Sequence, residues 1–507
     1  MLQGPDILYD LLASIFRAYL VHGSVSHQIL SCAFLPLFKG GFKDPDKFDS
    51  YRAIAGSSQI LKLFEYVLLL LWGDHLETDS LQFGFKQGVS TTQCTWLVNE
   101  VTNYFVRRGT AVNACLLDCS KAFDKCRFDK LFEKLKNKGL PDLVVRVLIF
   151  IYEEQIGWVS LAGKKSNSFR ITNGTRQGSV LSPILFSVYL DGLLVELRKL
   201  QLGCHVGGYW FGAACYADDL ILLAPSRDVL QKMLHVCETY AKEHNLMFST
   251  DPVPAKSKSK CLYFCGRKGR RVTYPAPLIL NGKELPWVES ADHLGHRLHQ
   301  LCNMDADSQR ARGKFISSTI EVREKLSFAR PEHIMNAIQI YCTDAYGSML
   351  WDLGNTTSEQ YFKSWNTCVK MVYEVPRNTF TYLIEGWFTS CMPSLRNQVI
   401  SRYPKFYRQL TESRSKEIRF LVQIVSNDPR STTYKNLRLL RERTNLRQAE
   451  CYSRRQILIS LPTERVPDTD IWRVRLLASC LKMRTEIENR VQDTEKICAM
   501  TFGLCST

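Results

Sequence analysis

Long apolar segments and export signals are missing from this 507-residue chain. Its longest apolar stretch, residues 60–72, contains Lys62 and Glu65 and is too short to span a bilayer, so it predicts a buried helix. The first residues, MLQGPDILYDLLASIF, lack a basic start, an apolar run and a small-residue cleavage site, which excludes a secretory signal there. There is no internal repeat and no low-complexity tract. We therefore expect a folded nuclear or cytoplasmic protein that is not secreted and does not enter a membrane.

Paired cysteines are also missing. The chain has 18 cysteines, yet none forms a CxxC pair and their spacing shows no regular framework. Several of them interrupt apolar runs, as Cys115, Cys215 and Cys261 do. These features exclude a disulfide-stapled secreted domain and predict buried, reduced thiols in a cytosolic or nuclear protein.

A row of four candidate metal ligands follows the last of these runs. His293, His296, His299 and Cys302 recur at every third position. Successive members of such a row face opposite sides of a strand, and no second ligand cluster lies nearby in the sequence. The spacing therefore argues against a zinc site.

Positive charge is present in excess. The chain has 66 Lys and Arg against 50 Asp and Glu, a formal net charge of +16. Such an excess indicates a polyanionic partner, because basic side chains that neutralise phosphates release counterions. Nucleic acid is the first candidate, a membrane surface the second, and a merely soluble basic surface the third. From residue 401 onward there are 21 basic and 12 acidic residues, so a net charge of +9 lies in the last fifth of the chain.

Hydrophobic periodicity alternates between helix and strand periods up to about residue 300. Helices are predicted over residues 6–22, 58–72, 91–107, 127–138, 141–153, 180–199 and 227–244. Strands are predicted over residues 31–38, 111–118 and 260–264, with two more within 157–172. From about residue 306 the pattern is helical to the end of the chain. This order predicts α/β or α+β architecture, with a sheet that carries helices on one face and a boundary near residue 303.

Carboxylates stand where two predicted strands end. AVNACLLD (111–118) is an apolar run that ends in Asp118, and FGAACYADDLILLA (211–224) consists of two apolar runs joined by Asp218 and Asp219. Turn chemistry places the two joined aspartates at a hairpin tip. Adjacent carboxylates repel each other and need either a cation or full solvation. Three hard oxygen ligands suit Mg²⁺, and two such ions about 3.5 to 4 Å apart can stabilise an in-line phosphoryl transfer. The alternative for an isolated aspartate pair is a solvated turn.

Ordered motifs around these carboxylates resemble those of reverse transcriptases from non-LTR (LINE-type) retrotransposons. LLDCSKAFDK (116–125) resembles their first catalytic motif, TRQGSVLSPILFSVYLD (175–191) their template- and nucleotide-binding motif, and YADD (216–219) their metal-binding hairpin. Weaker similarities lie in LPLFKGGFKDPDKFDSYRAIA (35–55), FGFKQGVST (83–91), AKSKSKCLYF (255–264) and DHLG (292–295). The resemblance extends from residue 7 to about residue 300.

The resemblance implies a metal set and its ions. Asp118 and Asp218 would hold both of two Mg²⁺ ions, for which Mn²⁺ is a possible substitute, and Asp219 would be the third, more weakly committed carboxylate. These three aspartates would be the catalytic residues of the enzyme.

It also implies a nucleotide-binding set. Phe123 matches the bulky residue that blocks a ribose 2′-hydroxyl, so deoxynucleotides would be preferred. Arg52 and Lys39 would contact the incoming triphosphate, and Gln177 and Gly178 would line the nucleotide pocket. Lys258 matches the motif lysine that contacts phosphate or donates a proton. Its sequence neighbours Lys256 and Lys260 are alternatives for this role.

The architecture implied by the resemblance is a right-hand polymerase. Fingers and palm would occupy residues 18–302, a helical thumb and post-thumb segment 303–400, and a basic helical region 401–507. The basic helices beyond residue 400 would bind template RNA, unless their charge is only a solvated face. Because the motifs begin almost at Met1, no amino-terminal endonuclease is expected in this chain.

The implied activity is RNA-directed DNA polymerisation as part of a non-LTR retrotransposon, with template RNA, primer DNA and deoxynucleotide triphosphates as partners. The alternative is a catalytically inactive, nucleic-acid-binding remnant of a transposable element. The intact Asp118, Asp218, Asp219, Phe123 and Gln177 weigh against that alternative. A maturase would show a maturase segment after the thumb, and the sequence contains none that we recognise.

Overall fold

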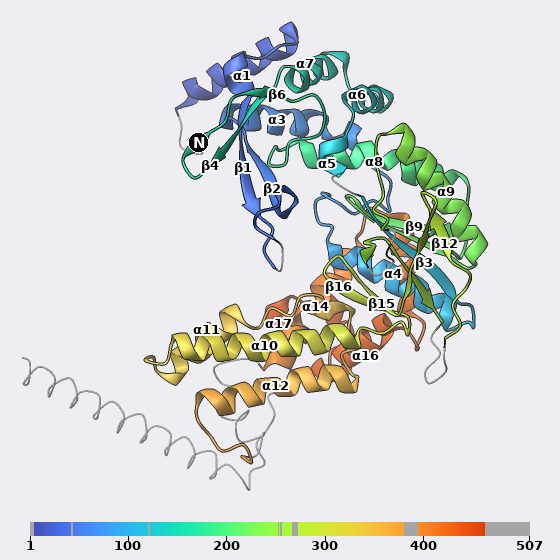
Figure 1. The fold of residues 1–507 in the computed structure, drawn as a ribbon. Helices are drawn as coiled ribbons and strands as arrows, with labels where there is room; N and C mark the ends of the chain where they lie inside the picture. Colours follow the sequence, from blue (N-terminus) through green and yellow to red (C-terminus); the bar gives the residue numbers. More distant parts are fainter. Residues whose placement is uncertain are drawn as a thin grey trace, which may run out of the picture. The chain divides into compact units, whose positions relative to one another are not determined.

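Two compact units make up the chain in its computed structural model, which describes residues 5–41, 44–119, 122–251, 253, 256–265, 272–379 and 394–461. The first unit comprises residues 1–295, 300–302 and 414–417, and the second comprises residues 296–299, 303–413 and 418–507. The first unit mixes strands with helices, whereas the described residues of the second are mainly helical (Figure 1). The expected mixed α and β content is thus present. The finer division into fingers, palm and thumb, and the expected domain limits, stay predictions.

The helices of the first unit are α1 (Asp6–His22), α2 (His27–Leu30), α3 (Gln59–Trp72), α4 (Thr91–Val106), α5 (Ala122–Lys125), α6 (Phe128–Asn137), α7 (Asp142–Glu153), α8 (Ser182–Lys199) and α9 (Arg227–Glu243). Its strands are β1 (Ser31–Phe38), β2 (Tyr51–Gly56), β3 (Val112–Asp118), β4 (Ile156–Leu161), β5 (Lys164–Lys165), β6 (Phe169–Arg170), β7 (His205–Val206), β8 (Tyr209–Trp210), β9 (Ala213–Tyr216), β10 (Asp219–Ala224), β11 (Lys260–Phe264), β12 (Leu278–Leu280), β13 (Lys283–Leu285), β14 (Trp287–Val288) and β15 (Ser290–His293).

Most predicted elements of this unit are confirmed, and local stop signals explain their ends. Helix α1 ends at Gly23, whose φ of 66° suits a left-handed C-cap. Helix α4 begins after Ser90, whose side chain accepts a hydrogen bond from Gln93 N at 3.4 Å. Strand β11 has the predicted bounds, and the two strands expected within 157–172 are β4 and the short β5 and β6.

One sheet of the first unit has the strand order β2-β1-β4-β5, with β6 beside β4. Strands β1 and β2 form an antiparallel hairpin in which Leu37 is the partner of Arg52 and Pro36 the partner of Ala53. Strand β4 adds to β1 in parallel. Because successive residues of a strand face opposite sides, Arg52 and Ala53 lie on opposite faces of this sheet.

The second sheet has the order β14-β11-β3-β10-β9, and it positions the carboxylates. Strand β3 is antiparallel to both β10 and β11 and is buried at every residue except Asp118. Helices α9 and α4 pack against this sheet, and α8 packs against α9 (Figure 1). A central strand that is buried on both faces reads as a continuous apolar run, which is why the segment before Asp118 shows no alternation.

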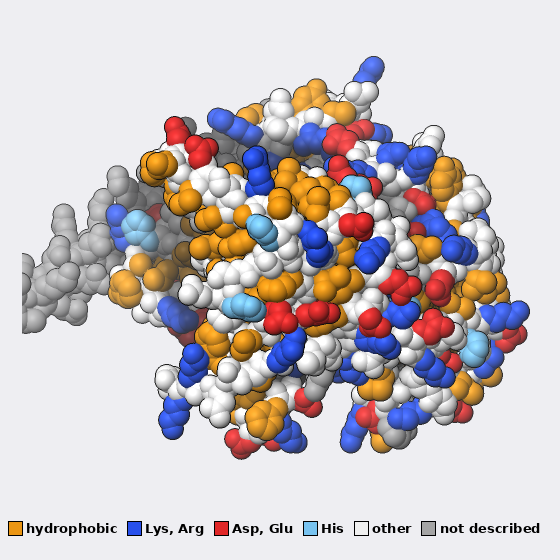
Figure 2. Space-filling view, turned by 90° about the horizontal axis from the view of Figure 1, so that it is seen from above, with side chains coloured by type: hydrophobic (Ala, Val, Ile, Leu, Met, Phe, Trp, Pro, Cys, Tyr) orange, Lys and Arg blue, Asp and Glu red, His pale blue; other side chains and the backbone are white. Residues whose placement is uncertain are grey.

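Helix α1 covers α3 but keeps much of its own apolar surface in solvent. Phe16 is its one buried residue and packs on Phe64 of α3 at 5.1 Å between ring centroids. Ile7, Leu11 and Val21 remain largely exposed. Figure 2, which looks down on α1 and α7, shows hydrophobic side chains grouped on this face. The predicted buried helix of residues 60–72 is α3, whose Leu61, Phe64 and Leu68 are buried whereas others of its apolar side chains are exposed.

The described elements of the second unit are β16 (His296–His299), α10 (Asp305–Lys325), α11 (Pro331–Tyr341), α12 (Thr356–Val372), α14 (Leu395–Thr411), α15 (Lys416–Ser426, whose first two residues belong to the first unit), α16 (Thr432–Thr444) and α17 (Arg454–Ser460). Helix α10 contacts both α11 and α12. Residues 462–507, the last part of the expected basic region, lie outside the described residues.

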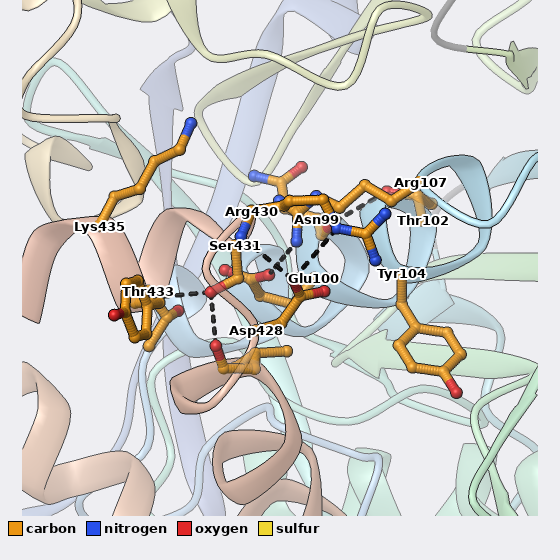
Figure 3. Close-up of polar contacts among 12 residues, drawn as sticks. Asn99, Glu100, Thr102, Tyr104, Arg107, Asp428, Arg430, Ser431, Thr433 and Lys435 are labelled. Atoms are coloured by element: carbon orange, nitrogen blue, oxygen red, sulfur yellow. Dashed lines mark hydrogen bonds and ion pairs between the residues drawn. The ribbon is translucent and has the colours of Figure 1, made fainter.

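Polar side chains fix the ends of several helices. In the turn between α15 and α16, Asp428 Oδ1 accepts hydrogen bonds from Arg430 N at 3.1 Å and Arg430 Nε at 3.3 Å. Ser431 then caps α16, because its Oγ accepts a hydrogen bond from Tyr434 N at 2.8 Å. On α4 of the first unit, Glu100 and Arg107 form an ion pair at 3.9 Å. Figure 3 shows both groups.

His296 of the histidine row is buried in the second unit. Its Nδ1 lies 3.1 Å from Asp307 Oδ2, and its ring stacks on Tyr346 at 4.7 Å between centroids. Asp307 also accepts hydrogen bonds from Arg297 N at 2.9 Å and Arg310 Nη2 at 2.7 Å. This histidine thus pairs with a carboxylate and packs on an aromatic ring within the second unit.

The cysteines within the described residues are free thiols, and all of them are buried except Cys265, Cys302 and Cys451. For this part of the chain, the prediction of buried, reduced cysteines is confirmed. Among the same residues, no helix is both long enough and apolar enough to cross a membrane.

Candidate active site

Asp118 lies at the carboxyl end of the buried strand β3, beside the start of β10. Its Cα partner across the antiparallel pair is Asp219. The backbone of Asp118 is fixed from the other side as well: its N donates to Ser259 Oγ at 3.2 Å, and its O accepts from Ser249 N at 2.8 Å. Burial of the preceding strand and these two bonds determine where this carboxylate leaves the sheet.

Asp218 and Asp219 occupy different places in the hairpin. Strand β9 ends at Tyr216 and β10 begins at Asp219, so the two-residue turn consists of Ala217 and Asp218. The prediction that both aspartates form the hairpin tip is therefore wrong for Asp219, which already pairs with Tyr216. Ala217 has a φ of 57°, a left-handed conformation that lets the strands close with two residues. This shift leaves Asp219 directly opposite Asp118.

The carboxylates of this site interact electrostatically. Burial, and then repulsion by Asp118, raise the pKa of Asp218 above its usual range. Burial, and then repulsion by Asp218 and Asp118, raise the pKa of Asp219 to about 6, although its solvent access moderates this shift by screening. Lys258 opposes both shifts, and its Nζ lies 3.3 Å from Asp118 Oδ2. The site accumulates negative charge that one lysine partly offsets.

The three carboxylates meet some of the needs of a divalent cation and not others. Their donor chemistry suits a hard cation, and the strand register brings the three backbones to one end of one sheet. Within the described residues, however, no three His, Cys, Asp or Glu side chains are close enough to form a metal-binding group. The backbones of the three aspartates are placed as the predicted ligand set requires, whereas their side chains are not close enough together to form a metal-binding group.

Phe123 lies in the short helix α5, five residues after Asp118. Its ring stacks on the buried Phe186 of α8 at 4.3 Å between centroids and 22° between planes. Phe85 meets it edge-on at 6.3 Å. Its carbonyl O accepts a hydrogen bond from Thr175 N at 2.7 Å, which joins α5 to the loop that carries Gln177. The ring is thus held between two other phenylalanines.

Gln177 and Gly178 lie against strand β2. Gln177 O accepts a hydrogen bond from Ala55 N at 2.7 Å. Gly178 has a φ of 116°, and a Cβ at this position would lie 2.7 Å from Ala55 O. Glycine is required here both by its backbone conformation and by the close approach of β2.

Arg52 and Lys39 lie at the hairpin of β1 and β2 and are both exposed. Lys39 Nζ donates to Asp49 O at 2.7 Å, and its N donates to Ser50 O at 2.8 Å. Arg52 shares its face of the hairpin with Leu37. Among the described residues, Lys258 is the motif lysine that forms an ion pair with a carboxylate of the site, whereas Lys256 and Lys260 form none with it.

A buried ion pair was missed by the sequence analysis. Glu65 of α3 and Arg176 are both almost fully buried, and Arg176 Nη2 lies 3.1 Å from Glu65 Oε1. Glu65 Oε2 also accepts hydrogen bonds from Ser179 Oγ and, at 2.8 Å, from Val180 N. An acidic residue inside an apolar helical run was the available signal, but its partner is more than a hundred positions away. The pair thus joins the loop that carries Gln177 to helix α3.

A cavity of about 350 Å³ lies beside this loop, away from the carboxylates. It is lined by Phe34, Ala53, Asp124, Val159 and residues 169–177. Because Ala53 faces away from Arg52, this cavity opens on the other face of the hairpin. None of the three aspartates lines it.

Comparison with protein families matches residues 42–298, half of the chain, to the family described as reverse transcriptase (RNA-dependent DNA polymerase). The matched range contains both strand ends with their aspartates and also contains Arg52, Phe123, Gln177 and Lys258.

Several curated proteins are similar to the chain. A retrovirus-related Pol polyprotein from the type-1 retrotransposable element R2 of Nasonia vitripennis is 26% identical over 285 residues, which are 56% of this chain and 27% of that protein. The RNA-directed DNA polymerase from the mobile element jockey of Drosophila melanogaster is 27% identical over 355 residues, 67% of this chain and 37% of that protein. A probable RNA-directed DNA polymerase from transposon BS of the same organism is 29% identical and covers 57% and 31%. The chain thus spans between about a quarter and just over a third of these relatives.

Solved structures give a weaker similarity. Apo telomerase from Candida tropicalis matches with a TM-score of 0.39 and 11% identity, covering 90% of this chain and 74% of that one. Telomerase from Candida albicans in complex with a telomeric RNA fragment matches with the same TM-score and 10% identity, covering 82% and 68%. At these scores neither structure adds to the assignment.

Proposed function

The chain belongs to the reverse transcriptase (RNA-dependent DNA polymerase) family, and from this premise we propose that it extends a DNA primer on an RNA template as part of a non-LTR retrotransposon. The observation that carries the proposal is the register of the second sheet, in which Asp118 and Asp219 are direct partners and Asp218 occupies the adjoining turn. Carboxylates at neighbouring strand ends are what nucleotidyl transfer by two metal ions requires.

Asp118, Asp218 and Asp219 would hold the divalent ions, which we propose to be two Mg²⁺, with Mn²⁺ as a substitute. Bound ions of this kind stabilise the charge on the attacking and leaving oxygens of a phosphoryl transfer. The raised pKa values of Asp218 and Asp219 support the proposal, because a cation would relieve the repulsion that contributes to them. Lys258 would be released from Asp118 to contact phosphate when cations occupy the site.

The remaining residues would bind and select the nucleotide. Phe123 would exclude a ribose 2′-hydroxyl, and its packing between Phe85 and Phe186 supports a rigid gate. Arg52 and Lys39 would contact the triphosphate from the exposed hairpin, where charge-assisted bonds bind phosphate well. Gln177 and Gly178 would form the pocket floor, with the close approach of Ala55 as support.

We also propose the assignment of parts. The sheet of β1, β2 and β4 would belong to the fingers and the sheet of β3, β10 and β11 to the palm, both within residues 18–302. Residues 303–400 would form the thumb and post-thumb segment, and residues 401–507 would form a basic region that binds template RNA. The proposed location of the protein is the nucleus or the cytoplasm.

Primer extension tests the proposal. The chain is given an RNA template annealed to a DNA primer, Mg²⁺ and the four deoxynucleotide triphosphates, and is compared with Asp218→Ala. We expect extension by the native chain and none by the variant. If the folded native chain binds the duplex but never extends it, the protein is an inactive remnant. If both proteins extend equally, the metal assignment is wrong.

A further inference from the structure

The segment Gln82–Phe85, which precedes α4, contacts both the turn that carries Asp218 and the ring of Phe123. Gln82 is fully buried, and its side-chain amide makes four hydrogen bonds. Its Oε1 accepts from Ala217 N at 3.0 Å and from Gly84 N at 2.9 Å. Its Nε2 donates to Ala217 O at 3.4 Å and to Cys215 Sγ at 3.3 Å. One amide thus satisfies both polar backbone groups of the residue that precedes Asp218.

Backbone bonds hold the same segment against strand β9. Phe83 N donates to Cys215 O at 2.7 Å, and Cys215 N donates to Leu81 O at 2.9 Å. Gly84 is pressed against the hairpin turn, since a Cβ at this position would lie 2.4 Å from Ala217 N. The segment therefore forms an isolated parallel β-bridge between Gln82 and Cys215 at the edge of the sheet. Only glycine fits where the segment comes closest to the turn.

The turn of Ala217 and Asp218 has a conformation and a charge that are unfavourable without stabilising contacts. Ala217 has a positive φ, which costs free energy in a residue with a Cβ. The adjoining carboxylates of Asp218 and Asp219 also repel each other. Without the amide of Gln82, the buried N–H of Ala217 would lose this hydrogen bond, and its C=O would keep the one that Cys215 Sγ donates at 3.0 Å.

Phe85 extends the same segment to Phe123. Its ring meets Phe123 edge-on at 6.3 Å, on a backbone with a φ of 58°. The next residue is also tied down: Lys86 Nζ donates to Asp79 O at 2.6 Å and to Thr78 O at 3.1 Å. The segment thus contacts the turn that carries Asp218 and also contacts Phe123, the residue that would select the sugar.

We propose that residues 82–85 are a positioning segment of the nucleotidyl transfer site, in which Gln82 fixes the turn that presents Asp218 and Phe85 fixes the ring of Phe123. The inference rests on the proposed function for its kinetic consequences, although the contacts themselves do not depend on it. Its two ends act on different properties. Gln82 controls the rate of transfer and its dependence on Mg²⁺, whereas Phe85 controls the choice between deoxynucleotides and ribonucleotides.

The first test replaces Gln82 with Met, which has a similar length but no hydrogen-bonding amide. Gln155→Met is the matched control, because Gln155 is also fully buried but its side-chain atoms have no hydrogen-bond partner. We expect kcat of Gln82→Met to fall about 10- to 100-fold, because misplaced catalytic groups cost that much. We also expect it to need more Mg²⁺, with the deoxynucleotide KM and the sugar preference nearly unchanged. Equal kcat in the two variants would overturn the role of Gln82.

Hydrogen exchange of the peptide that contains Ala217 gives a readout that does not require activity. Gln82→Met should exchange faster at this peptide than the native chain or Gln155→Met, and unchanged exchange would contradict the contact. If Gln82→Met does not fold, Gln82→Glu replaces it in both measurements. Its carboxylate can accept from Ala217 N but cannot donate to Ala217 O, so an intermediate loss of kcat is expected and native kcat would overturn the role.

The second test replaces Phe85 with Ala. We expect ribonucleotide incorporation relative to deoxynucleotide incorporation to rise about tenfold, because Phe123 loses one of its two ring neighbours. The kcat for deoxynucleotides should change much less than in Gln82→Met. If Phe85→Ala lowers kcat without changing sugar selection, the positioning of Phe123 is refuted. If the native chain never extends a primer, the proposed function fails, while the exchange experiment still decides the contact between Gln82 and the turn.

Discussion

The strand ends that carry Asp118 and Asp218 differ from the hairpin that carries Arg52 and Lys39, although both belong to the first unit. Asp118 follows a buried central strand, and the turn before Asp218 is bonded on both backbone groups to Gln82. Arg52 and Lys39 are exposed on a two-stranded hairpin at the margin of the other sheet. Under the proposed roles, the groups that would meet a metal within tenths of an ångström are positioned by the core, whereas the groups that would attract phosphate act from an exposed surface. The predictions below test this contrast.

Asp118→Asn should give the largest effect. It keeps the size and backbone contacts of Asp118 but removes the charge, so kcat for primer extension should fall about 1,000-fold because charge stabilisation at the reacting phosphate is lost. Thermal unfolding should be unchanged or shifted upward, since less negative charge remains at the strand ends. A variant with more than a tenth of native kcat would remove Asp118 from the metal set.

Phe123→Val should act on selection instead of rate. With a smaller side chain beside the sugar, the preference for deoxynucleotides over ribonucleotides should fall about 10- to 100-fold. The measurement is competitive incorporation opposite one template base, with Phe128→Val as an aromatic control outside the site. Unchanged sugar discrimination would show that the packed ring of Phe123 has no gate role.

Arg52→Ala tests the exposed hairpin, the second of the two regions compared. Loss of one charge-assisted phosphate contact should raise the deoxynucleotide KM about tenfold and lower kcat less. Lys232→Ala, which removes one exposed charge from α9, should leave both constants near native values. A fall in kcat with an unchanged KM would mean that Arg52 is positioned as strictly as the aspartates, and the contrast would fail.

Asp219→Asn should give the smallest effect, measured as stability without divalent ions. Burial and repulsion raise the pKa of Asp219 to about 6 from its usual 3.8, so the folded state holds this proton more tightly than the unfolded state. Native stability should therefore decrease as pH rises from about 4 to about 6, and Asn avoids this loss. At about pH 7.5 the variant should melt about 1 to 2 °C higher, with no difference near about pH 4. A lower melting temperature at about pH 7.5 would contradict the repulsion.

Sequence alone predicted the parts of the site that depend on local patterns. Apolar periodicity identified β3 with its terminal Asp118, and it identified the helix over residues 6–22. The register of the turn was missed by one residue, because an alanine with a positive φ replaces the glycine or asparagine that usually marks such turns.

Long-range polar contacts were not predictable in the same way. Gln82 and Ala217 are 135 positions apart, and Glu65 and Arg176 are 111 positions apart. A glutamine before Phe-Gly-Phe and a glutamate in an apolar helix indicate that a polar group is buried, but not which partner satisfies it. Only the packing of the first unit determines those partners.

The hydrogen bond between Ala55 N and Gln177 O joins the hairpin of β1 and β2 to the loop that carries Gln177. Arg52 lies three residues before Ala55 on strand β2, and Gly178 follows Gln177 directly. If a bound triphosphate displaced Arg52, this hydrogen bond would carry part of the displacement to Gln177. Under the proposed roles, contact with the triphosphate and the position of the pocket would then be coupled through this bond, while the buried pair of Glu65 and Arg176 holds the same loop to α3.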